Sequence, residues 1–425
     1  MTTGLYQTHQ ERSYWEKFSD VTFFIWIVCI FFDERSAVGR LSLAIFMGIV
    51  VLFIFFKAAD IKKEFNYPSA VNLFFLSYFA FYAYNYWRIY INGIILSFNV
   101  AAPMLKTIGI NGIFLYLVYK YCVMKNNMEQ VLRIYVYAEL ISIATVIVQS
   151  GNSIFSGRLG GAVEVNANSI ALAAITCLII ILYSNSKKRS ILNLLLIAAY
   201  VGIIMLTGSR KGLLGMAMGI FMHFGMDKGY KRIINILLVI LSLFVVYLLV
   251  MNVDFLYDIA GHRLEALFSY FKGERFNEAS LASRGNYTHL GWKYIGKRIW
   301  TGYGLDCFRM LKGAYGTYSH NNYLELMFGC GLIGTLLYYL GYLYILFGHL
   351  KLYFKHKIMD AKPYIILMVI QIFLEYAIVT YFERTGILVV VLSLAAMQLL
   401  KSKIDVDKEI EENAKGAKKV DKKSI

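Results

Sequence analysis

Long apolar runs alternate with short polar or basic segments along most of the chain. Apolar runs of about 17–25 residues are typical of helices that cross a bilayer, and somewhat shorter runs can also span it. Window length and hydropathy together predict about twelve spanning helices. They lie near residues 18–32, 41–56, 70–88, 107–124, 131–149, 169–183, 191–207, 212–226, 233–251, 321–347, 364–381 and 386–400.

Residues 252–320 form the one large segment between these predicted spans. Within it, 255–271 and 284–300 alternate apolar and basic residues at helical spacing, which is typical of amphipathic surface helices. We expect a break at Gly285-Asn286 and a second at Gly302-Tyr303-Gly304. Between two predicted spans, in the segment 89–106, residues 89–100 fit a re-entrant or interfacial piece. The charged tail after residue 400 lacks aromatic residues, so we expect it to be disordered.

The predicted fold is therefore an all-α polytopic membrane protein with one large loop that contains amphipathic helices. Composition agrees, because the 425 residues are 58% hydrophobic and 16% charged, whereas soluble domains are nearer half apolar and a quarter charged. We expect three parts: N-terminal spanning helices over 1–149, a membrane core over 150–400 with the loop 252–320, and a cytoplasmic charged tail over 401–425.

The net charge of +16 would also suit a nucleic-acid-binding protein, but its placement argues against one. Much of the positive charge lies in short loops between apolar runs and in the tail, which is typical of the cytoplasmic side of a membrane protein. We therefore expect the bilayer and no nucleic acid as a partner. The same pattern predicts a multi-pass protein of the cytoplasmic (inner) membrane with both termini in the cytoplasm and the loop 252–320 outside.

Two cations stand at an unfavourable place on the predicted outer face. Ser209 is a good N-cap for a helix that starts near Gly212, so Arg210 and Lys211 fall in its first turn, where the helix dipole repels cations. They also oppose the positive-inside bias. Together these costs predict a bound anion, and a helix N-terminus with a guanidinium is a good phosphate site. The alternatives are contact with lipid headgroups, or pairing of Arg210 with Glu164 or Glu383.

Two further arginines lie in predicted outer segments. Arg158 stands in a glycine-rich stretch ahead of Asn168, and glycine lets a backbone approach a ligand closely. Arg284 follows Ser283 in the large loop. Both fit a second anion or sugar contact. On the residue pattern alone, Arg284 fits the solvated face of an amphipathic helix better, and many loops are rich in glycine.

His320 lies at the start of a long apolar helix, just after the large loop. The positive end of that helix favours the neutral imidazole, which could accept a proton from a hydroxyl. Asn321 and Asn322 could orient sugar hydroxyls, and Glu325 lies about one turn inside. The alternative is that the polar residues only cap the helix.

No grouping of His, Cys and carboxylate residues has zinc spacing, and no nucleotide-binding glycine motif is present, so we expect no metal and no cofactor.

The chain resembles the O-antigen ligase/polymerase superfamily, which includes Wzy-type polysaccharide polymerases, over about residues 150–345. Each motif is weak alone, and their order around one large loop carries the resemblance. The motifs are Arg158-Leu159-Gly160-Gly161 with Asn166-Ala167-Asn168, Thr207-Gly208-Ser209-Arg210-Lys211-Gly212, Ser283-Arg284-Gly285, Trp300-Thr301-Gly302-Tyr303-Gly304-Leu305, His320-Asn321-Asn322-Tyr323-Leu324-Glu325 and Gly329-Cys330-Gly331-Leu332-Ile333-Gly334.

The resemblance implies a membrane glycosyltransferase that moves sugar chains from undecaprenyl pyrophosphate on the outer face of the cytoplasmic membrane. Arg210 would hold the donor pyrophosphate together with Arg284 and Arg158, and His320 would activate the acceptor hydroxyl. The substrate contacts to be expected are Arg158, Asn168, Ser209, Lys211, Asn321, Asn322 and Glu325. The implied partners are the undecaprenyl-pyrophosphate-linked glycan and, in the same pathway, a flippase and a chain-length regulator.

Three alternatives stay open at this point. A ligase would attach finished chains to another acceptor, whereas a polymerase would join repeat units for a capsule, exopolysaccharide or O-antigen. We favour the polymerase because it is the commoner role. A lipid-linked glycan flippase or transporter would show related halves and polar residues near mid-membrane, which the sequence lacks. A non-catalytic scaffold would not need His320 and Arg210 together.

Overall fold

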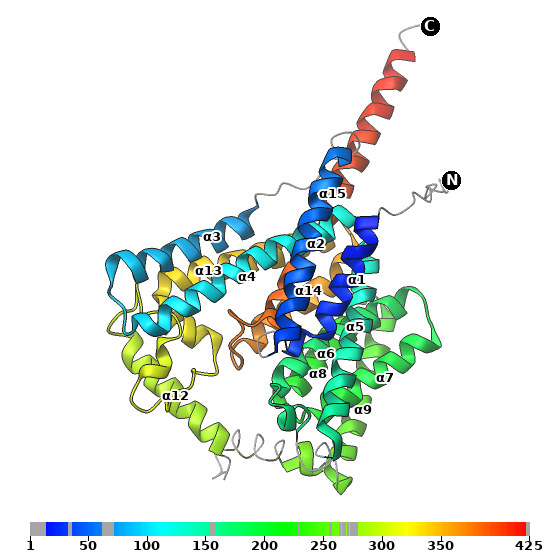
Figure 1. The fold of residues 1–425 in the computed structure, drawn as a ribbon. Helices are drawn as coiled ribbons and strands as arrows, with labels where there is room; N and C mark the ends of the chain where they lie inside the picture. Colours follow the sequence, from blue (N-terminus) through cyan, green and yellow to red (C-terminus); the bar gives the residue numbers. More distant parts are fainter. Residues whose placement is uncertain are drawn as a thin grey trace.

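A computed structural model describes residues 14–32, 36–61, 72–152, 158–227, 229–254, 257–262 and 279–421, with the single positions 265, 269 and 272. All regular structure in these residues is helical, and the predicted fold class is confirmed. Most of the predicted helix 255–271 lies outside the described residues. The helices pack into one bundle, from which the end of the last helix projects (Figure 1).

Each of the predicted spans falls on a helix. These helices are α1 (Tyr14–Val28), α2 (Ala37–Ile61), α3 (Leu73–Tyr86), α4 (Phe98–Lys125), α5 (Met128–Ser150), α6 (Ala167–Lys187), α7 (Ile191–Leu206), α8 (Arg210–Gly225), α9 (Tyr230–Asn252), α13 (Asn322–Phe354), α14 (Lys362–Leu374) and α15 (Arg384–Asp421). Helix α12 (Ala279–Ile295) lies in the large loop. Shorter turns are η1 (Ile30–Phe32), η2 (Trp87–Asn92), η4 (Gly161–Val163), η5 (Tyr257–Gly261), η6 (Cys307–Met310) and η7 (Met359–Ala361).

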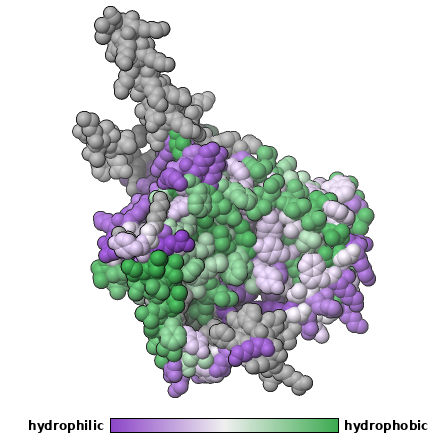
Figure 2. All heavy atoms as spheres, turned by 180° about the vertical axis from the view of Figure 1, so that it is seen from behind, coloured by the Kyte–Doolittle hydropathy of each residue, from purple (hydrophilic) through white to green (hydrophobic). Residues whose placement is uncertain are grey.

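Seven of the described helices are long and apolar enough to cross a membrane, so a count of twelve spans is not confirmed. These seven are α2, α4, α5, α6, α9, α13 and α15. Apolar side chains lie both inside the bundle and on its outside, as expected when lipid is the solvent. Helix α6 is largely enclosed by α7, α8 and other neighbours, while α9 exposes large apolar residues. One face of the molecule shows a broad apolar area with hydrophilic residues nearer its ends (Figure 2).

Two local predictions were wrong. Helix α12 runs through Gly285 and Asn286 without a break, and it ends at Ile295. Helix α15 continues to Asp421, so most of the tail expected to be disordered is helical. In both cases a continuous helix extends over polar or glycine-containing sequence that composition alone would exclude. Residues 89–100 include the end of η2 and, from Phe98, the start of α4, and their re-entrant or interfacial placement stays a prediction.

Helix α13 is broken inside its length, and a loop segment fills the break. Gly331 has φ 66° and ψ −171°, a conformation that favours glycine. Tyr303 N–H donates to Phe328 O at 2.8 Å, and Leu332 N–H donates to Ile299 O at 2.7 Å. The loop backbone thus satisfies groups that an unbroken helix would have satisfied itself. The predicted break at Gly302–Gly304 is the segment that does this.

A buried arginine completes the junction. Arg88 is 2% exposed, and its guanidinium donates to Gly329 O at 2.9 Å and to Gly302 O at 3.1 Å. The Tyr84 hydroxyl donates to Cys330 O at 3.2 Å. The two glycine motifs around 302 and 331 therefore have a structural role: they let two backbones approach and share one arginine.

The start of α13 is fixed by a buried carboxylate. Glu375 is fully buried and accepts hydrogen bonds from the side chains of Asn322 (3.1 Å), Tyr339 (2.7 Å), Thr380 (2.6 Å) and Gln371 (3.0 Å). Asn322 Oδ1 in turn accepts the Thr380 N–H at 3.1 Å. These bonds hold the first turn of α13 against the connection between α14 and α15.

We predict that Gly331→Ala lowers the free energy of unfolding by about 2–3 kcal/mol, because alanine is strained at this positive φ. A Cβ at Gly331 would also lie 2.4 Å from the backbone of Trp300. Gly202→Ala in α7 is the matched control, since a Cβ there meets no atom within 4 Å. Thermal unfolding in detergent, followed by circular dichroism, measures both variants. Equal stability of the two would contradict this role for the junction.

Candidate active site

Arg158 is tied to the end of α7. Its Nε donates to Thr207 O at 2.9 Å, and the next residue, Leu159, donates its N–H to Leu206 O at 3.1 Å. Gly160 follows with φ 90°, and a Cβ there would lie 2.7 Å from Val165 O. The glycine is therefore needed for the turn that brings Arg158 beside the α7–α8 connection.

The first turns of α6 and α8 lie side by side. Ser209 is the N-cap of α8, because its hydroxyl accepts the Gly212 N–H at 3.2 Å. The same hydroxyl donates to Asn168 Oδ1 at 2.8 Å, and Arg158 Nη2 approaches this oxygen at 3.5 Å. The helix begins at Arg210, two residues before the expected start. Asn168 and Ser209 thus link two positive helix ends, which together favour an anionic ligand.

Lys211 lies at the centre of the cations. It is 8% exposed, and the charges of Arg284, Arg158 and Arg210 act on it together with the carboxylate of Glu383. Four segments that are far apart in the sequence supply these groups. The structure therefore brings together the four cations that the sequence singled out. Arg284 is among them, although its sequence pattern had favoured the solvated face of an amphipathic helix.

Helix α12 carries Arg284 toward His320. Tyr287, three residues later and on the same face of this helix, has its ring centroid 6.1 Å from that of His320. The Tyr318 ring lies 4.5 Å from His320 on another side. A Cβ at Gly291 would lie 2.8 Å from Leu324, so α12 rests closely on the start of α13. His320 is thus held between aromatic rings within reach of the Arg284 charge.

His320 itself has a left-handed backbone, with φ 58°. It does not cap α13, because Asn321 does so by accepting the Leu324 N–H at 3.1 Å. Burial, and then the charges of Arg284 and Lys211, lower the pKa of His320 to about 4. The imidazole is therefore neutral at pH 7 and able to accept a proton. The sequence pattern attributed this neutrality to the positive end of α13, whereas burial and the neighbouring cations cause it here.

The other polar residues predicted as substrate contacts in the 320–325 motif make hydrogen bonds within the protein. Asn322 is fully buried in the Glu375 network described above. Glu325 is 2% exposed, and its Oε2 accepts the Ser319 N–H at 2.8 Å. Asn321 uses its side-chain oxygen for the helix cap. All three shape the backbone on which His320 stands.

Glu383 is a site residue that sequence reasoning missed, since it entered only as a partner for Arg210. Its Oε2 accepts the Ser169 hydroxyl at 3.0 Å, one residue after Asn168. Burial raises the pKa of Tyr318, and the negative charge of Glu383 raises it further. The same charge acts on Lys211. The sequence did offer one signal for Glu383, which was its position. It lies in the short connection between the last two predicted spans, on the same predicted face as the cations.

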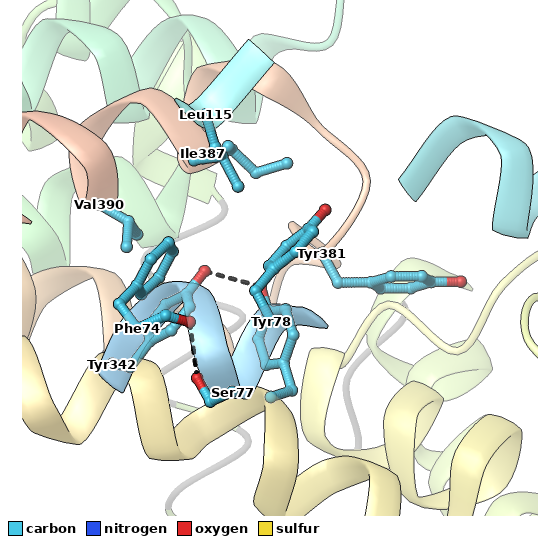
Figure 3. Close-up of a pocket in the computed structure, with 9 residues that line it drawn as sticks. Phe74, Ser77, Tyr78, Leu115, Tyr342, Tyr381, Ile387 and Val390 are labelled. Atoms are coloured by element: carbon cyan, nitrogen blue, oxygen red, sulfur yellow. Dashed lines mark hydrogen bonds between the residues drawn. The ribbon is translucent and has the colours of Figure 1, made fainter. Parts of the chain in front are cut away.

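A small cavity between α3, α4, α13 and α15 does not belong to this site (Figure 3). Its volume is about 10 Å³, enough for about one water. Phe74, Tyr78 and Tyr342 line it, and the hydroxyls of Tyr338 and Tyr342 lie 2.6 Å apart. It is too small for a sugar or a lipid. Among the described residues, no group of three or more His, Cys, Asp or Glu residues could hold a metal ion.

The fold and the site define a polytopic membrane protein with a cluster of cations and a neutral histidine at the N-terminal ends of several helices. A family model described as O-antigen ligase matches residues 195–339. This match confirms the resemblance to the O-antigen ligase/polymerase superfamily over these residues. Members of this family are membrane enzymes of the glycosyltransferase type. The match includes Arg210, Arg284 and His320, whereas Arg158 and Glu383 lie outside it. No curated protein matches the chain.

We predict that inorganic pyrophosphate raises the pKa of His320 from about 4 by at least about one unit, because its negative charge offsets the cations nearby. Nuclear magnetic resonance of ¹³C-labelled histidine measures this shift, and loss of the signal in His320→Asn assigns it. A pKa near 6.5 that pyrophosphate leaves unchanged would contradict the described electrostatics.

Proposed function

We propose that this protein transfers a glycan from a polyprenyl-pyrophosphate donor to a sugar hydroxyl on the outer face of the cytoplasmic membrane. The convergence of Arg158, Arg210, Lys211 and Arg284 beside a neutral His320 carries this proposal. A pyrophosphate group is the multiply charged anion that such a cluster fits, and the long lipid fits a site at the end of a membrane bundle.

The proposed step is a direct displacement at the anomeric carbon. The acceptor oxygen forms a bond to this carbon while the bond to the pyrophosphate oxygen breaks. The hydroxyl proton goes to His320, which later releases it to water. Negative charge builds on the leaving pyrophosphate, so the cations stabilise the transition state more than the ground state. No metal is required in this step, because the cations supply the charge.

We favour a polymerase that joins repeat units of a capsule, exopolysaccharide or O-antigen, with undecaprenyl pyrophosphate as the carrier lipid. A ligase would use the same donor and the same step with a different acceptor, and it stays the alternative. A flippase is less well supported, because the cations lie at the ends of helices, whereas transporter sites usually lie near the bilayer midplane.

Arg210→Lys tests the pyrophosphate contact. A lysine keeps the charge but cannot form the bidentate contacts of a guanidinium. We expect Arg210→Ala to lose about 2–4 kcal/mol of transition-state stabilisation and Arg210→Lys to lose a large part of it. Polymer length in cells at equal protein level measures the effect. Arg133→Lys, at an exposed position of α5, is the matched control. Wild-type polymer in Arg210→Ala would refute the contact.

His320→Asn tests the proton acceptor. Asparagine tolerates the left-handed backbone of this position and Asn321 still caps α13, so the fold is retained. If His320 accepts the proton, His320→Asn and His320→Ala should both lower turnover by roughly 10²–10⁴-fold while donor binding persists.

Single-turnover transfer and donor binding measure the two quantities. His289→Asn, on the exposed face of α12, is the control. An active His320→Asn enzyme would assign a structural role to the histidine and direct the search for a base to Glu383, which lies among the same cations.

A further inference from the structure

A second cavity lies at the other end of the helices that build the candidate site. Helix α8 starts at the site with Arg210 and ends at Gly225, and α13 starts there with Asn322 and ends at Phe354. A cavity of about 350 Å³ lies at these far ends, within the range of about 300–1,000 Å³ for small-molecule sites. Its lining includes Asp227 after α8, Arg232 of α9 and Lys357 after α13. The cavity is therefore separate from the candidate active site.

The charges that line this cavity are mainly positive. Arg232 and Lys357 are exposed and contribute a guanidinium and an ammonium group. The carboxylate of Asp227 is occupied, because it accepts hydrogen bonds from Lys362 at 2.9 Å and from Asn235 at 3.0 Å. The lining therefore suits an anion, although it contains one acidic residue.

Exposed apolar side chains adjoin the cations. Phe354 is 60% exposed and Met359 is 45% exposed, and both line the cavity. The wall between them and α8 is fixed, because the buried Tyr353 donates its hydroxyl to Met226 O at 3.0 Å. Cations beside exposed apolar groups fit a ligand that has both an anionic head and an apolar chain. Free phosphate has the charge but no apolar chain. Basic pockets between helices are known to bind lipid headgroups in this way.

The backbone of Lys357 is an independent observation. Its φ is 59°, in the left-handed region where glycine is preferred after a helix. The Ile358 N–H donates to Leu352 O at 3.0 Å across this residue and closes the helix end. A lysine here costs of order 1 kcal/mol relative to glycine, so its side chain is expected to have a use.

We propose that this cavity binds the headgroup of an anionic phospholipid. Arg232 and Lys357 would contact the phosphate, and Phe354 and Met359 would contact the start of the acyl chains. This inference does not depend on the proposed glycosyl transfer, since none of these residues belongs to the candidate active site.

The experiment is a thermal-shift titration of the purified full chain in detergent with phosphatidylglycerol, phosphatidylcholine or inorganic phosphate. We expect phosphatidylglycerol alone to raise the Tm of the wild type. In Lys357→Gly and Arg232→Gln, its apparent Kd should be at least tenfold weaker. Lys355→Gln, an exposed lysine that does not line the cavity, should bind as the wild type does.

Lys357→Gly should fold well, because glycine relieves the left-handed strain, so its Tm without lipid should equal or exceed that of the wild type. Lys357→Asn gives a second variant that tolerates this backbone without the charge. Unchanged binding of phosphatidylglycerol in Lys357→Gly and Lys357→Asn would overturn the proposed site. An equal shift with phosphatidylcholine would overturn the selectivity for an anionic head, and a full shift with inorganic phosphate would overturn a lipid as the occupant.

Discussion

Apolar surroundings leave unpaired backbone groups no water to bind, and the broken helix α13 has to meet that constraint. Its break at Gly331 is stable because the 299–304 segment and the buried Arg88 supply the missing hydrogen-bond partners. This junction fixes the end of the large loop to the bundle. As a result α12, which precedes the segment directly, lies over the start of α13 and brings Arg284 toward His320.

The candidate site depends on the same principle at the start of α13. Glu375 and Asn322 form hydrogen bonds with each other and with neighbouring polar groups in the interior, and they fix the first turn of α13 against the connection that carries Glu383. Polar groups that are fully paired can specify one arrangement of packed helices. The cations and the histidine can therefore be held close together despite their mutual repulsion, until an anion offsets it.

Local patterns predicted what depends on local structure. The apolar runs located the helices, and Ser209 ahead of two cations marked the start of α8, because an N-cap acts within three residues. The pairing of the glycine motifs, the burial of Asn322 and the place of Glu383 depend on contacts between distant segments, and one sequence does not reveal them. The role of His320 as proton acceptor stays a prediction, and the alternative of helix capping is met by its neighbour Asn321.

Glycosyl transfer at a polyprenyl pyrophosphate has one product that neither transport nor a scaffold can yield. The purified protein in lipid nanodiscs, given a polyprenyl-pyrophosphate-linked repeat unit, should release free polyprenyl pyrophosphate in equal amount to the glycosidic bonds formed. Mass spectrometry of the lipid and glycan fractions measures both. Release that matches bond formation is the result predicted here. Intact donor after prolonged incubation with folded protein and a suitable acceptor would contradict the central claim.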